Sequence, residues 1–558
     1  MQIVAPGWLP TSQRPSRFAS RGHTPHLVKR CWLRYQAATA GVRDDMSDAV
    51  VGQVERSTPV AGRTFYVIVA ILVLLFGVKL ITSSTMELRT DEAYHWTWSQ
   101  EWVVTYLDHP PMIAWFVRLG TSLFGDTLFG ARFADILAIL GAELLLADIV
   151  RRRTGSLTTA ALTMLAIEST IHVGAMGVLI EPSVPLILFC SLMFWAMCRL
   201  EETGEGRWWL LVGTAAGLAL LSKYTSLLFV PAVAVFLLAT PHGRRWLVTP
   251  WPWVAGLLAV VIFSPVLWWN LQNDWASVQY QSGRAVEAGT IELRHMLEFV
   301  VVHLGLVGLI MLPLIVVGSI LAALRALREG DGTTLALATA FLFFIGFLLF
   351  RSLTLRINTS WPIAVWPFGI TAAVITFQHR AAGLLGPAKA TGRRLLIAAI
   401  CVNIPLLLLM SWHATFDWMN WARADPIGRD DGYVEMAETI RTMADTGEVK
   451  WVATTDYRTY AIMRWMLRDR LPVVHVTQRS RYIGFTHPAE VGEPGVYVYE
   501  NGKQDPAVPE PLLGPAVTVD RSWRGFTYTS YEIRPFKDWT PDLTPPRDSP
   551  LYMWPDLV

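Results

Sequence analysis

The sequence predicts an α-helical protein that crosses a membrane about eleven times and ends in a small α/β domain. Three observations support this fold class. Of the 558 residues, 53% are hydrophobic and 16% are charged, whereas soluble domains contain roughly 25% charged residues. Apolar runs follow one another between residues 64 and 411. After residue 412 the composition becomes mixed and polar, which indicates a domain in water.

Residues 1–63 are basic and contain no apolar run long enough to span a membrane. We therefore expect a disordered, cytoplasmic extension without a secretory signal. Met46 is an alternative start, because the segment that follows it resembles a short cytoplasmic leader. The formal net charge of the chain is +2, which favours neither a nucleic-acid surface nor an acidic tail.

A helix needs about 20 apolar residues to cross the hydrocarbon core. By this rule the spans are expected at residues 64–82, 127–149, 157–178, 182–198, 208–222, 225–240, 252–269, 296–324, 334–350, 361–378 and 395–411. Alternate loops between these spans are rich in arginine and lysine, and the positive-inside rule places those loops in the cytoplasm. The spanning domain 64–411 therefore sends its first long loop, 83–126, and the tail 412–558 to the outer side.

The tail 412–558 is predicted to be a small α/β domain. Strand-like runs occur at Trp451–Thr454, Val473–Val476 and Val496–Tyr499, and they surround a helical pattern at Tyr460–Arg468. The last 25 residues are rich in proline, so we expect them to be extended.

The first outer loop holds the richest cluster of polar and aromatic residues near the membrane. It reads Thr90-Asp91-Glu92-Ala93-Tyr94-His95-Trp96 and then Tyr106-Leu107-Asp108-His109-Pro110-Pro111-Met112. The stretch Met112–Phe124 is apolar but too short to span, which predicts a helix in the membrane interface. A carboxylate among aromatic rings suits sugar transfer, which needs a base for the acceptor proton and flat faces for stacking. Alternatively, Asp91 caps a helix that begins at Glu92.

The pattern D-E-A-Y-x-W followed by Y-x-D-H-P-P-M resembles the first periplasmic loop of the bacterial membrane glycosyltransferases of the GT-C superfamily. These include the aminoarabinose and galacturonic acid transferases that modify lipid A and, more distantly, the protein O-mannosyltransferases. The resemblance continues through Leu221–Thr225, Trp268–Trp275 and Asn358–Pro362. It implies a GT-C fold in the bacterial inner membrane, with the active site and the tail domain in the periplasm.

The resemblance also implies the reaction. The donor would be a polyprenyl-phosphate sugar, transferred with inversion to a glycolipid, lipopolysaccharide or other cell-envelope glycan. Asp91 corresponds to the family's catalytic base. Glu181, which precedes Pro182, corresponds to a second acidic residue that is usually aspartate, and a favourable interaction with the helix dipole explains it equally well. The remaining residues expected to bind substrate are Glu92, Tyr94, Trp96, Tyr106, Asp108 and His109.

Cations on the outer side support a phosphate-bearing donor. Lys223, Arg284, Arg294, Arg351 and Arg356 lie where the positive-inside rule discourages them. Lys223 is the strongest candidate, because an unpaired ammonium in a short turn between apolar runs would be costly. The loop around Tyr280 and Arg284 resembles the family's lipid-phosphate loop, and Arg356 completes the expected donor set. Snorkelling to lipid headgroups is the alternative, above all for Arg294 and Arg351.

No cofactor is firmly expected. His95, His109 and Glu92 are candidate ligands for a divalent metal, although two histidines fourteen residues apart constrain a site weakly. The glycines form no nucleotide phosphate loop, so a nucleotide-sugar donor is not expected. Two alternatives remain open: a flippase or transporter of a lipid-linked sugar, in which the carboxylates relay protons, and an enzyme whose acceptor is Ser or Thr of a secreted protein.

Overall fold

The computed structural model describes residues 59–286, 290–378, 386–416, 418–419, 432–503, 507–523 and 525–543. The chain divides into two compact units, Met1–Thr64 and Phe65–Val558. Residues 1–58 lie outside the described residues, so the disordered extension stays a prediction. Apart from the first six residues of α2, all features below belong to the second unit.

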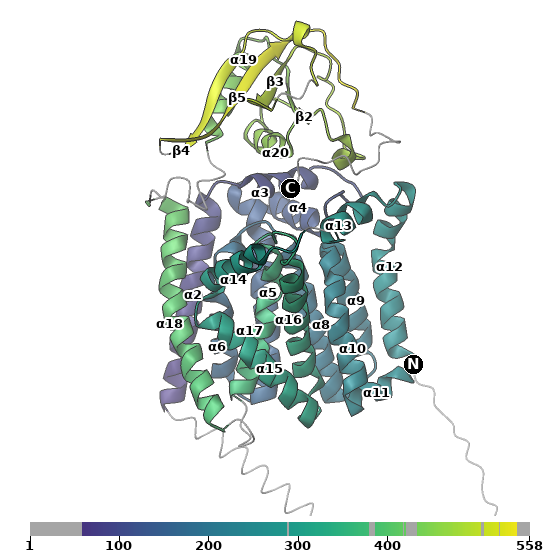
Figure 1. Ribbon diagram of the computed structural model, residues 1–558, viewed down its shortest axis with the longest axis vertical. Helices are drawn as coiled ribbons and strands as arrows, with labels where there is room; N and C mark the ends of the chain where they lie inside the picture. The colour runs from purple at the N-terminus through teal and green to yellow at the C-terminus, as the bar shows by residue number, and fades with distance from the viewer. Residues whose placement is uncertain are drawn as a thin grey trace, which may run out of the picture. The chain divides into compact units, whose positions relative to one another are not determined.

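The described helices follow one another closely up to residue 416 (Figure 1). They are α2 (Pro59–Thr85), α3 (Thr90–Ser99), α4 (Met112–Phe124), α5 (Leu128–Thr154), α6 (Leu157–Glu168), α7 (Ile171–Gly174), η1 (Met176–Val178), α8 (Ser183–Thr203), α9 (Trp208–Ser222), η2 (Tyr224–Phe229), α10 (Val230–Ala239), α11 (Pro241–Leu247), α12 (Trp251–Gln272), α13 (Ala276–Val286), α14 (Leu293–Val307), α15 (Met311–Glu329), α16 (Gly332–Arg351), η3 (Trp361–Ala364), α17 (Trp366–Gln378) and α18 (Gly386–Phe416).

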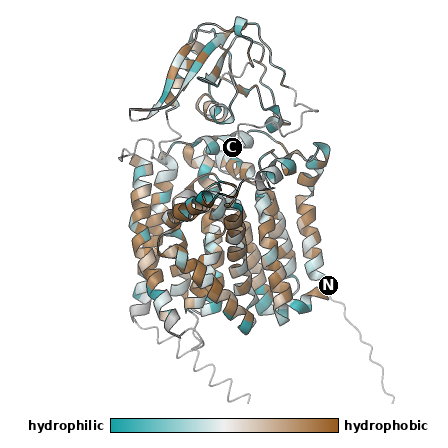
Figure 2. Ribbon diagram, in the orientation of Figure 1, coloured by the Kyte–Doolittle hydropathy of each residue, from teal (hydrophilic) through white to brown (hydrophobic). Residues whose placement is uncertain are grey.

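The protein is a multi-pass membrane protein. Among the described residues, six helices are long and apolar enough to cross a membrane, namely α2, α8, α12, α15, α16 and α18. The segments Tyr224–Ala239 and Pro241–Leu247 meet at a bend of 100° and add one further span if they are counted together. Figure 2 shows hydrophobic residues along these helices. The expected count of eleven spans is not confirmed.

One expected span, 296–324, is two helices. The break between α14 and α15 falls at Gly308, whose φ of 112° favours glycine. A Cβ atom there would lie 2.3 Å from Oδ1 of Asn403. The Asn403 amide donates to the Val307 carbonyl at 2.8 Å and so satisfies a helix-end acceptor. Hydropathy missed this break because both flanking helices are apolar.

Small residues let the central helices approach closely. α8 packs on α5 and α9, and α9 packs on α12. At the α9–α12 contact, a Cβ atom on Gly213 would lie 2.3 Å from the Ala255 carbonyl oxygen. Such close backbone contact is how helices gain packing energy in a membrane, where no water is excluded from their interface.

The loop at residues 83–126, which the sequence places on the outer side, contains the two helices α3 and α4. Every residue of α3 is buried except Asp91. α4 coincides with the expected interfacial helix, and its Trp115, Leu119 and Leu123 are exposed at intervals of four residues. This spacing forms one apolar stripe, as an interfacial helix requires.

The C-terminal domain contains one five-stranded sheet with the order β2-β1-β3-β5-β4. β1 pairs in parallel with β2 and β3, whereas β5 is antiparallel to β3 and β4. Its elements are α19 (Val434–Asp445), β1 (Trp451–Thr454), α20 (Tyr457–Met466), β2 (Val473–His475), η6 (Arg479–Tyr482), β3 (Gly495–Glu500), η7 (Glu510–Leu512), β4 (Val517–Trp523) and β5 (Phe526–Phe536). The three expected strands and the expected helix are present, while α19, β4 and β5 were not anticipated. Residues 544–558 of the expected extended end lie outside the described residues.

α20 joins this domain to the first outer loop. Asp456 caps the helix, because its carboxylate accepts the backbone N–H groups of Arg458 and Thr459 at 3.1 and 2.8 Å. The helix packs against α3, and the rings of Trp465 and Trp96 meet edge to face with centroids 5.1 Å apart.

Candidate active site

A buried ion pair holds α3 in place. Arg132 of α5 donates from Nε and Nη2 to the two carboxylate oxygens of Glu92, at 2.8 Å each. The same oxygens accept the backbone N–H groups of Ile180 at 3.0 Å and Arg89 at 3.1 Å. Glu92 was expected to bind substrate, but protein donors already occupy both of its oxygens. Its geometry instead supports a positioning role, since it ties α3 to α5 and to the segment before α8.

Asp91, the next residue, is exposed at the start of α3. The hydroxyl of Tyr457 lies 3.4 Å from its Oδ1, and Nε of Arg458 donates to that hydroxyl at 3.2 Å. The N-cap residue of α3 is Arg89, so the alternative that Asp91 caps the helix is wrong. A carboxylate in the first helical turn is still favoured by the helix dipole.

Asp108 receives a cation from the C-terminal domain. Nη1 of Arg481 in η6 lies 2.7 and 2.8 Å from its two oxygens, and the Tyr94 hydroxyl donates at 2.9 Å. Nη2 of Arg481 also donates to the Tyr280 hydroxyl at 3.2 Å. Burial raises the pKa of Asp108, but the charge and bonds of Arg481 outweigh it and hold that pKa below its ordinary value. One arginine thus connects three predicted site residues.

Glu181 and Lys223 form an ion pair. Nζ of Lys223 lies 3.1 Å from Oε1 of Glu181 and donates to Oγ of Ser183 at 2.8 Å, while that hydroxyl donates to Glu181 at 3.0 Å. Lys223 is buried at the end of α9. Burial raises the pKa of Glu181, yet Lys223 and His95 lower it more, so it lies below the ordinary value. The structure therefore joins the second predicted acid to the first predicted phosphate ligand.

His95 connects these groups electrostatically. Its buried ring has Nδ1 3.2 Å from the Ile180 carbonyl oxygen. Burial lowers the pKa of His95, while Glu181, Asp91 and Asp108 each raise it through their charges. The three carboxylates thus converge on one imidazole. Within the described part of the chain, no three His, Cys, Asp or Glu side chains lie together in a way that could hold a metal ion.

Several aromatic residues expected to stack on sugar are packed inside the protein. The Trp96 indole donates to Asp126 at 2.7 Å. Tyr106 stacks on Trp98 with centroids 4.5 Å apart, and its hydroxyl donates to the Trp98 carbonyl at 2.8 Å. The His109 ring lies 6.3 Å from the ring of Trp98. These residues shape the loop that carries the acids.

The remaining donor candidates have partners other than Glu181 and Lys223 where the structure describes their contacts. Arg356 is highly exposed and pairs with Glu298 of α14 at 3.3 Å, as Arg294 does at 2.9 Å. Arg284 belongs to α13, but its side chain lies outside what the structure describes. Tyr280 is the member of the set that reaches Arg481.

Sequence reasoning missed three residues of this site: Arg132, Tyr457 and Arg481. Arg132 offered a signal, because it is a charge inside an expected span, where a partner is required. Tyr457 and Arg481 offered none. Their domain showed no recognisable motif, and their partners Asp91 and Asp108 lie more than 360 residues away in the chain.

Known proteins resemble this chain in sequence and in fold. Residues 108–269 match the family model of dolichyl-phosphate-mannose-protein mannosyltransferase. The lipid A galacturonosyltransferase RgtD of Rhizobium johnstonii is 31% identical over 260 residues, which is 46% of this chain and 53% of that protein. The undecaprenyl phosphate-alpha-4-amino-4-deoxy-L-arabinose arabinosyl transferase 1 of Sodalis glossinidius is 30% identical over 178 residues, 30% of this chain and 32% of its own length. The matches thus span about half, or less, of these curated relatives.

The fold comparison covers more of the chain. The crystal structure of ArnT from Cupriavidus metallidurans bound to undecaprenyl phosphate aligns with a TM-score of 0.57 and 17% identity, over 86% of this chain and 99% of that one. Its apo form aligns with the same score over 89% of this chain. The chain therefore has the GT-C fold of the membrane glycosyltransferases, as the motifs of its first outer loop predicted.

Proposed function

We propose that the chain is an inverting glycosyltransferase that moves a sugar from a polyprenyl-phosphate donor to a lipid or cell-envelope glycan. The names of the relatives support both substrates, since one transfers galacturonic acid to lipid A and ArnT was crystallised with undecaprenyl phosphate. The charge asymmetry of the loops supports a site on the periplasmic side of the bacterial inner membrane.

The observation that carries the proposal is an exposed carboxylate on a fixed helix. Asp91 is the exposed residue of α3, and the adjacent Glu92 locks that helix to Arg132. A general base must reach the acceptor hydroxyl while its own position is held by surrounding contacts. Asp91 meets both requirements, so we assign it the removal of the acceptor proton.

Lys223 is assigned to the leaving group. As the acceptor oxygen bonds to the anomeric carbon, the bond from that carbon to the phosphate oxygen breaks and its electrons stay on the phosphate. An ammonium has three N–H donors, and Lys223 uses two of them for Glu181 and Ser183. The third is available for the departing phosphate, whose growing charge it would stabilise. Glu181 offsets the lysine charge when no donor is bound.

Asp108, Tyr94 and Tyr280 form a second, supporting layer. Arg481 holds them in a buried network, so these residues are assigned to shaping the donor side of the site. Such supporting contacts keep reactive groups within the narrow geometry that transfer requires.

Release of free polyprenyl phosphate from a labelled lipid-linked sugar tests the proposal. Asp91→Asn should lower that rate by about 10²- to 10⁴-fold, the usual contribution of a general base. Glu87→Gln is the matched control, because Glu87 is an exposed acid in the same loop. Normal turnover by Asp91→Asn would overturn the assignment. Movement of the labelled lipid across a vesicle membrane without any release would favour a flippase instead.

A further inference from the structure

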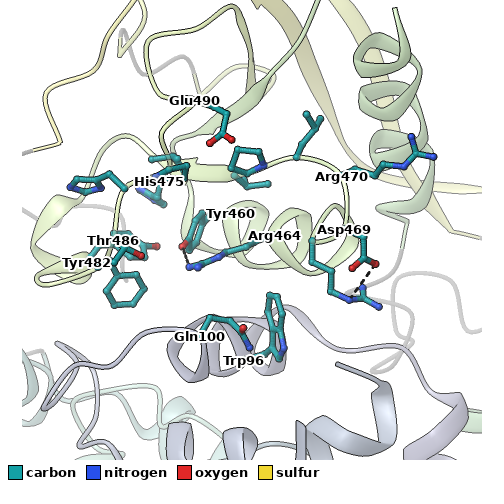
Figure 3. Close-up of a pocket in the computed structure, with 18 of the residues that line it drawn as sticks. Trp96, Gln100, Tyr460, Arg464, Asp469, Arg470, His475, Tyr482, Thr486 and Glu490 are labelled. Carbon is teal, nitrogen blue, oxygen red and sulfur yellow. Dashed lines mark hydrogen bonds and ion pairs between the residues drawn. The ribbon is translucent and has the colours of Figure 1, made fainter. Parts of the chain in front are cut away.

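A cavity on the C-terminal domain lies beside α3 but takes no part in the proposed chemistry. Its volume is about 540 Å³, within the range of small-molecule sites. The lining comes from Trp96 of α3, from Tyr460 and Arg464 of α20, and from the segment 468–490 (Figure 3). Because α3 also carries Asp91, the cavity and the proposed base share one rigid element, five residues apart, or about 7 Å along a helix axis.

Arginines line this cavity. The four are Arg464, Arg468, Arg470 and Arg479, and the acids that share the lining are Asp126, Asp469 and Glu490. Arg464 pairs with Glu101 at 2.8 Å and Arg470 with Asp445 at 3.0 Å. Arg468 stacks on Trp465 at 4.1 Å and lies 4.0 Å from Asp469.

Arg479 differs from the other three. It is 7% exposed, and its guanidinium donates to the backbone carbonyls of Leu543 at 3.1 Å and His475 at 2.6 Å. Among the described residues, no carboxylate lies within ion-pair distance of it. These bonds use two of its five N–H donors. Burial lowers the pKa of Arg479, which reflects the cost of a desolvated charge, and the charges of Tyr482, Tyr460 and Asp542 offset this lowering only in part. A bound anion would repay that cost.

Two polar atoms of residues that line this cavity also lack partners, and both lie just below its surface. Nε2 of His475 and the hydroxyl of Tyr482 accept or donate no hydrogen bond within the described structure, although these residues are only 1% and 2% exposed. Burial brings the pKa of His475 to about 3, so the ring is neutral at pH 7. Its Nδ1–H donates to the Thr477 carbonyl at 2.7 Å, which leaves Nε2 as an acceptor.

Unsatisfied buried groups are costly, and a ligand that binds beside them is one way to satisfy them. The rings of His475 and Tyr482 lie 4.9 Å apart, and Arg479 lies 5.6 Å above the Tyr482 ring. The three together offer an acceptor, a hydroxyl and a cation. Sugar hydroxyls match the first two, and an oxyanion on the same sugar matches the third.

We propose that this cavity binds an oxyanion-bearing sugar of the acceptor, with a phosphate or carboxylate at Arg479 and hydroxyls at His475 and Tyr482. That the ligand is the acceptor follows from the proposed function, whereas the binding itself is inferred from the cavity alone. The donor is assigned elsewhere, because Lys223 and Tyr280 do not line this cavity.

Calorimetric titration of the full-length protein in detergent tests the binding directly. Glucose 1-phosphate and glucuronate are the probes, and glucose is the neutral comparison. Both anionic sugars should bind at least about tenfold more tightly than glucose, since a charge-assisted bond contributes that much. Equal affinity for all three sugars, or no binding of any, would overturn the proposal.

Tyr482→Phe is the sharpest variant, because it removes a hydroxyl that has no partner and so should not lower the melting temperature. It should raise the dissociation constant of glucose 1-phosphate about 3- to 10-fold. Tyr499→Phe is the matched control, since that hydroxyl donates to Glu532 and lies outside the lining. Unchanged binding by Tyr482→Phe would exclude the assigned geometry.

Competition separates the acceptor from the donor. Undecaprenyl phosphate should leave glucose 1-phosphate bound, and its displacement of the sugar would place the donor in this cavity and overturn the proposal. In transfer assays, Tyr482→Phe should raise the KM for an anionic acceptor and leave the KM for the donor unchanged. Binding without any transfer would refute the proposed function while supporting the cavity as a sugar site.

Discussion

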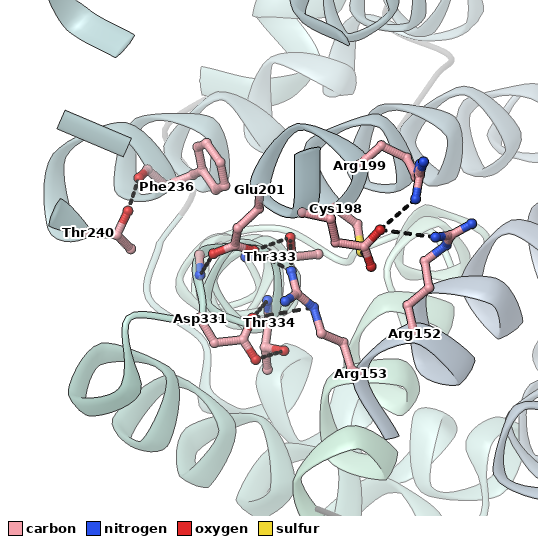
Figure 4. A network of polar contacts seen from close by, with 12 residues as sticks. Arg152, Arg153, Cys198, Arg199, Glu201, Phe236, Thr240, Asp331, Thr333 and Thr334 are labelled. Atoms are coloured by element: carbon pink, nitrogen blue, oxygen red, sulfur yellow. Dashed lines mark hydrogen bonds and ion pairs between the residues drawn. The ribbon is translucent and has the colours of Figure 1, made fainter. Parts of the chain in front are cut away.

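The two ends of α8 carry ion pairs that differ in how fully they are satisfied. At its carboxyl end, Glu201 accepts hydrogen bonds from Arg153, from the backbone N–H groups of Gly332 and Thr333 at 2.7 and 3.1 Å, and from the Thr333 hydroxyl at 2.7 Å. The dashed contacts in Figure 4 show Arg153 reaching Glu201, Thr333 and Asp331. This network joins α5, α8 and α16.

At the amino end, Glu181 has two donors among the described residues, Lys223 and Ser183, and both bind Oε1. No described residue donates to its Oε2, and its side chain is 21% exposed, against 11% for Glu201. The comparison separates two uses of buried charge. A carboxylate whose two oxygens both have protein donors, as in Glu201, holds helices together even though Nε of Arg153 has no hydrogen-bond partner there, whereas a carboxylate with an oxygen that no described residue binds can still receive a ligand.

Breaking the satisfied end should have the largest effect. Arg153→Gln is expected to lower the free energy of unfolding by about 3–5 kcal/mol, because it leaves the buried carboxylate of Glu201 without its cation, whereas Asp331 keeps Arg325 at 3.1 Å. Thermal unfolding in detergent measures this change. Arg207→Gln is the control, since its exposed pair with Glu205 should contribute roughly 0–1 kcal/mol. Equal melting temperatures for the two variants would contradict the comparison.

Breaking the unsatisfied end should affect turnover more than stability. Lys223→Gln is expected to lower donor turnover by about 10²- to 10³-fold, as the loss of one charge-stabilising group does. Ser183 and water would still solvate Glu181, so the melting temperature should fall less than in Arg153→Gln. Lys503→Gln, an exposed lysine of the C-terminal domain, is the control. Full turnover by Lys223→Gln would remove Lys223 from the site.

The pH dependence of the Asp108–Arg481 contact sharpens the comparison further. The pKa of Asp108 is lower in the folded protein than in the unfolded chain, where it is about 3.9. The ion pair therefore stabilises the folded state fully at pH values above about 3.9, and this stabilisation is lost as the pH falls through the pKa of the folded protein. The protection of the α3 backbone amides against hydrogen exchange, corrected for the intrinsic exchange rate, should therefore be the same at pH 7 and pH 5. Loss of protection already at pH 6 would be inconsistent with this ion pair.

The smallest effect is expected at Tyr457. Its hydroxyl lies 3.4 Å from Asp91, a long contact that contributes little. Tyr457→Phe should change kcat by about 2- to 10-fold, which corresponds to one modest hydrogen bond. Steady-state turnover measures it, with Tyr499→Phe again as control. A loss as large as that of Asp91→Asn would make Tyr457 part of the proton-transfer step.

The sequence could predict what local patterns determine. Apolar runs located most helices, and a short strand-like run placed β1 at Trp451–Thr454, where all four residues are buried. The break at Gly308 was hidden, because a glycine within an apolar run does not reveal its φ angle. β4 and β5 were missed, since their mixed polar faces lack a strong apolar alternation.

The site was predictable where its residues share a motif and unpredictable where they meet through the fold. Asp91 and Asp108 were proposed from the motif of one loop, and the pairing of Lys223 with Glu181 follows from the α8–α9 contact. The role of Arg481 could not be predicted, because no motif in the sequence around it indicates that it pairs with Asp108. The contact that gives Glu92 a positioning role could not be predicted either, because its partner Arg132 is forty residues away in the chain.

Two acids of the first outer loop, Glu101 and Asp108, receive their cations from Arg464 and Arg481 of the C-terminal domain. A chimaera that carried another protein's terminal domain would keep this loop formed only if the incoming domain supplied guanidinium groups at both places. Recombination among relatives is thereby restricted to matching halves, so the two parts of the chain are expected to have been inherited together.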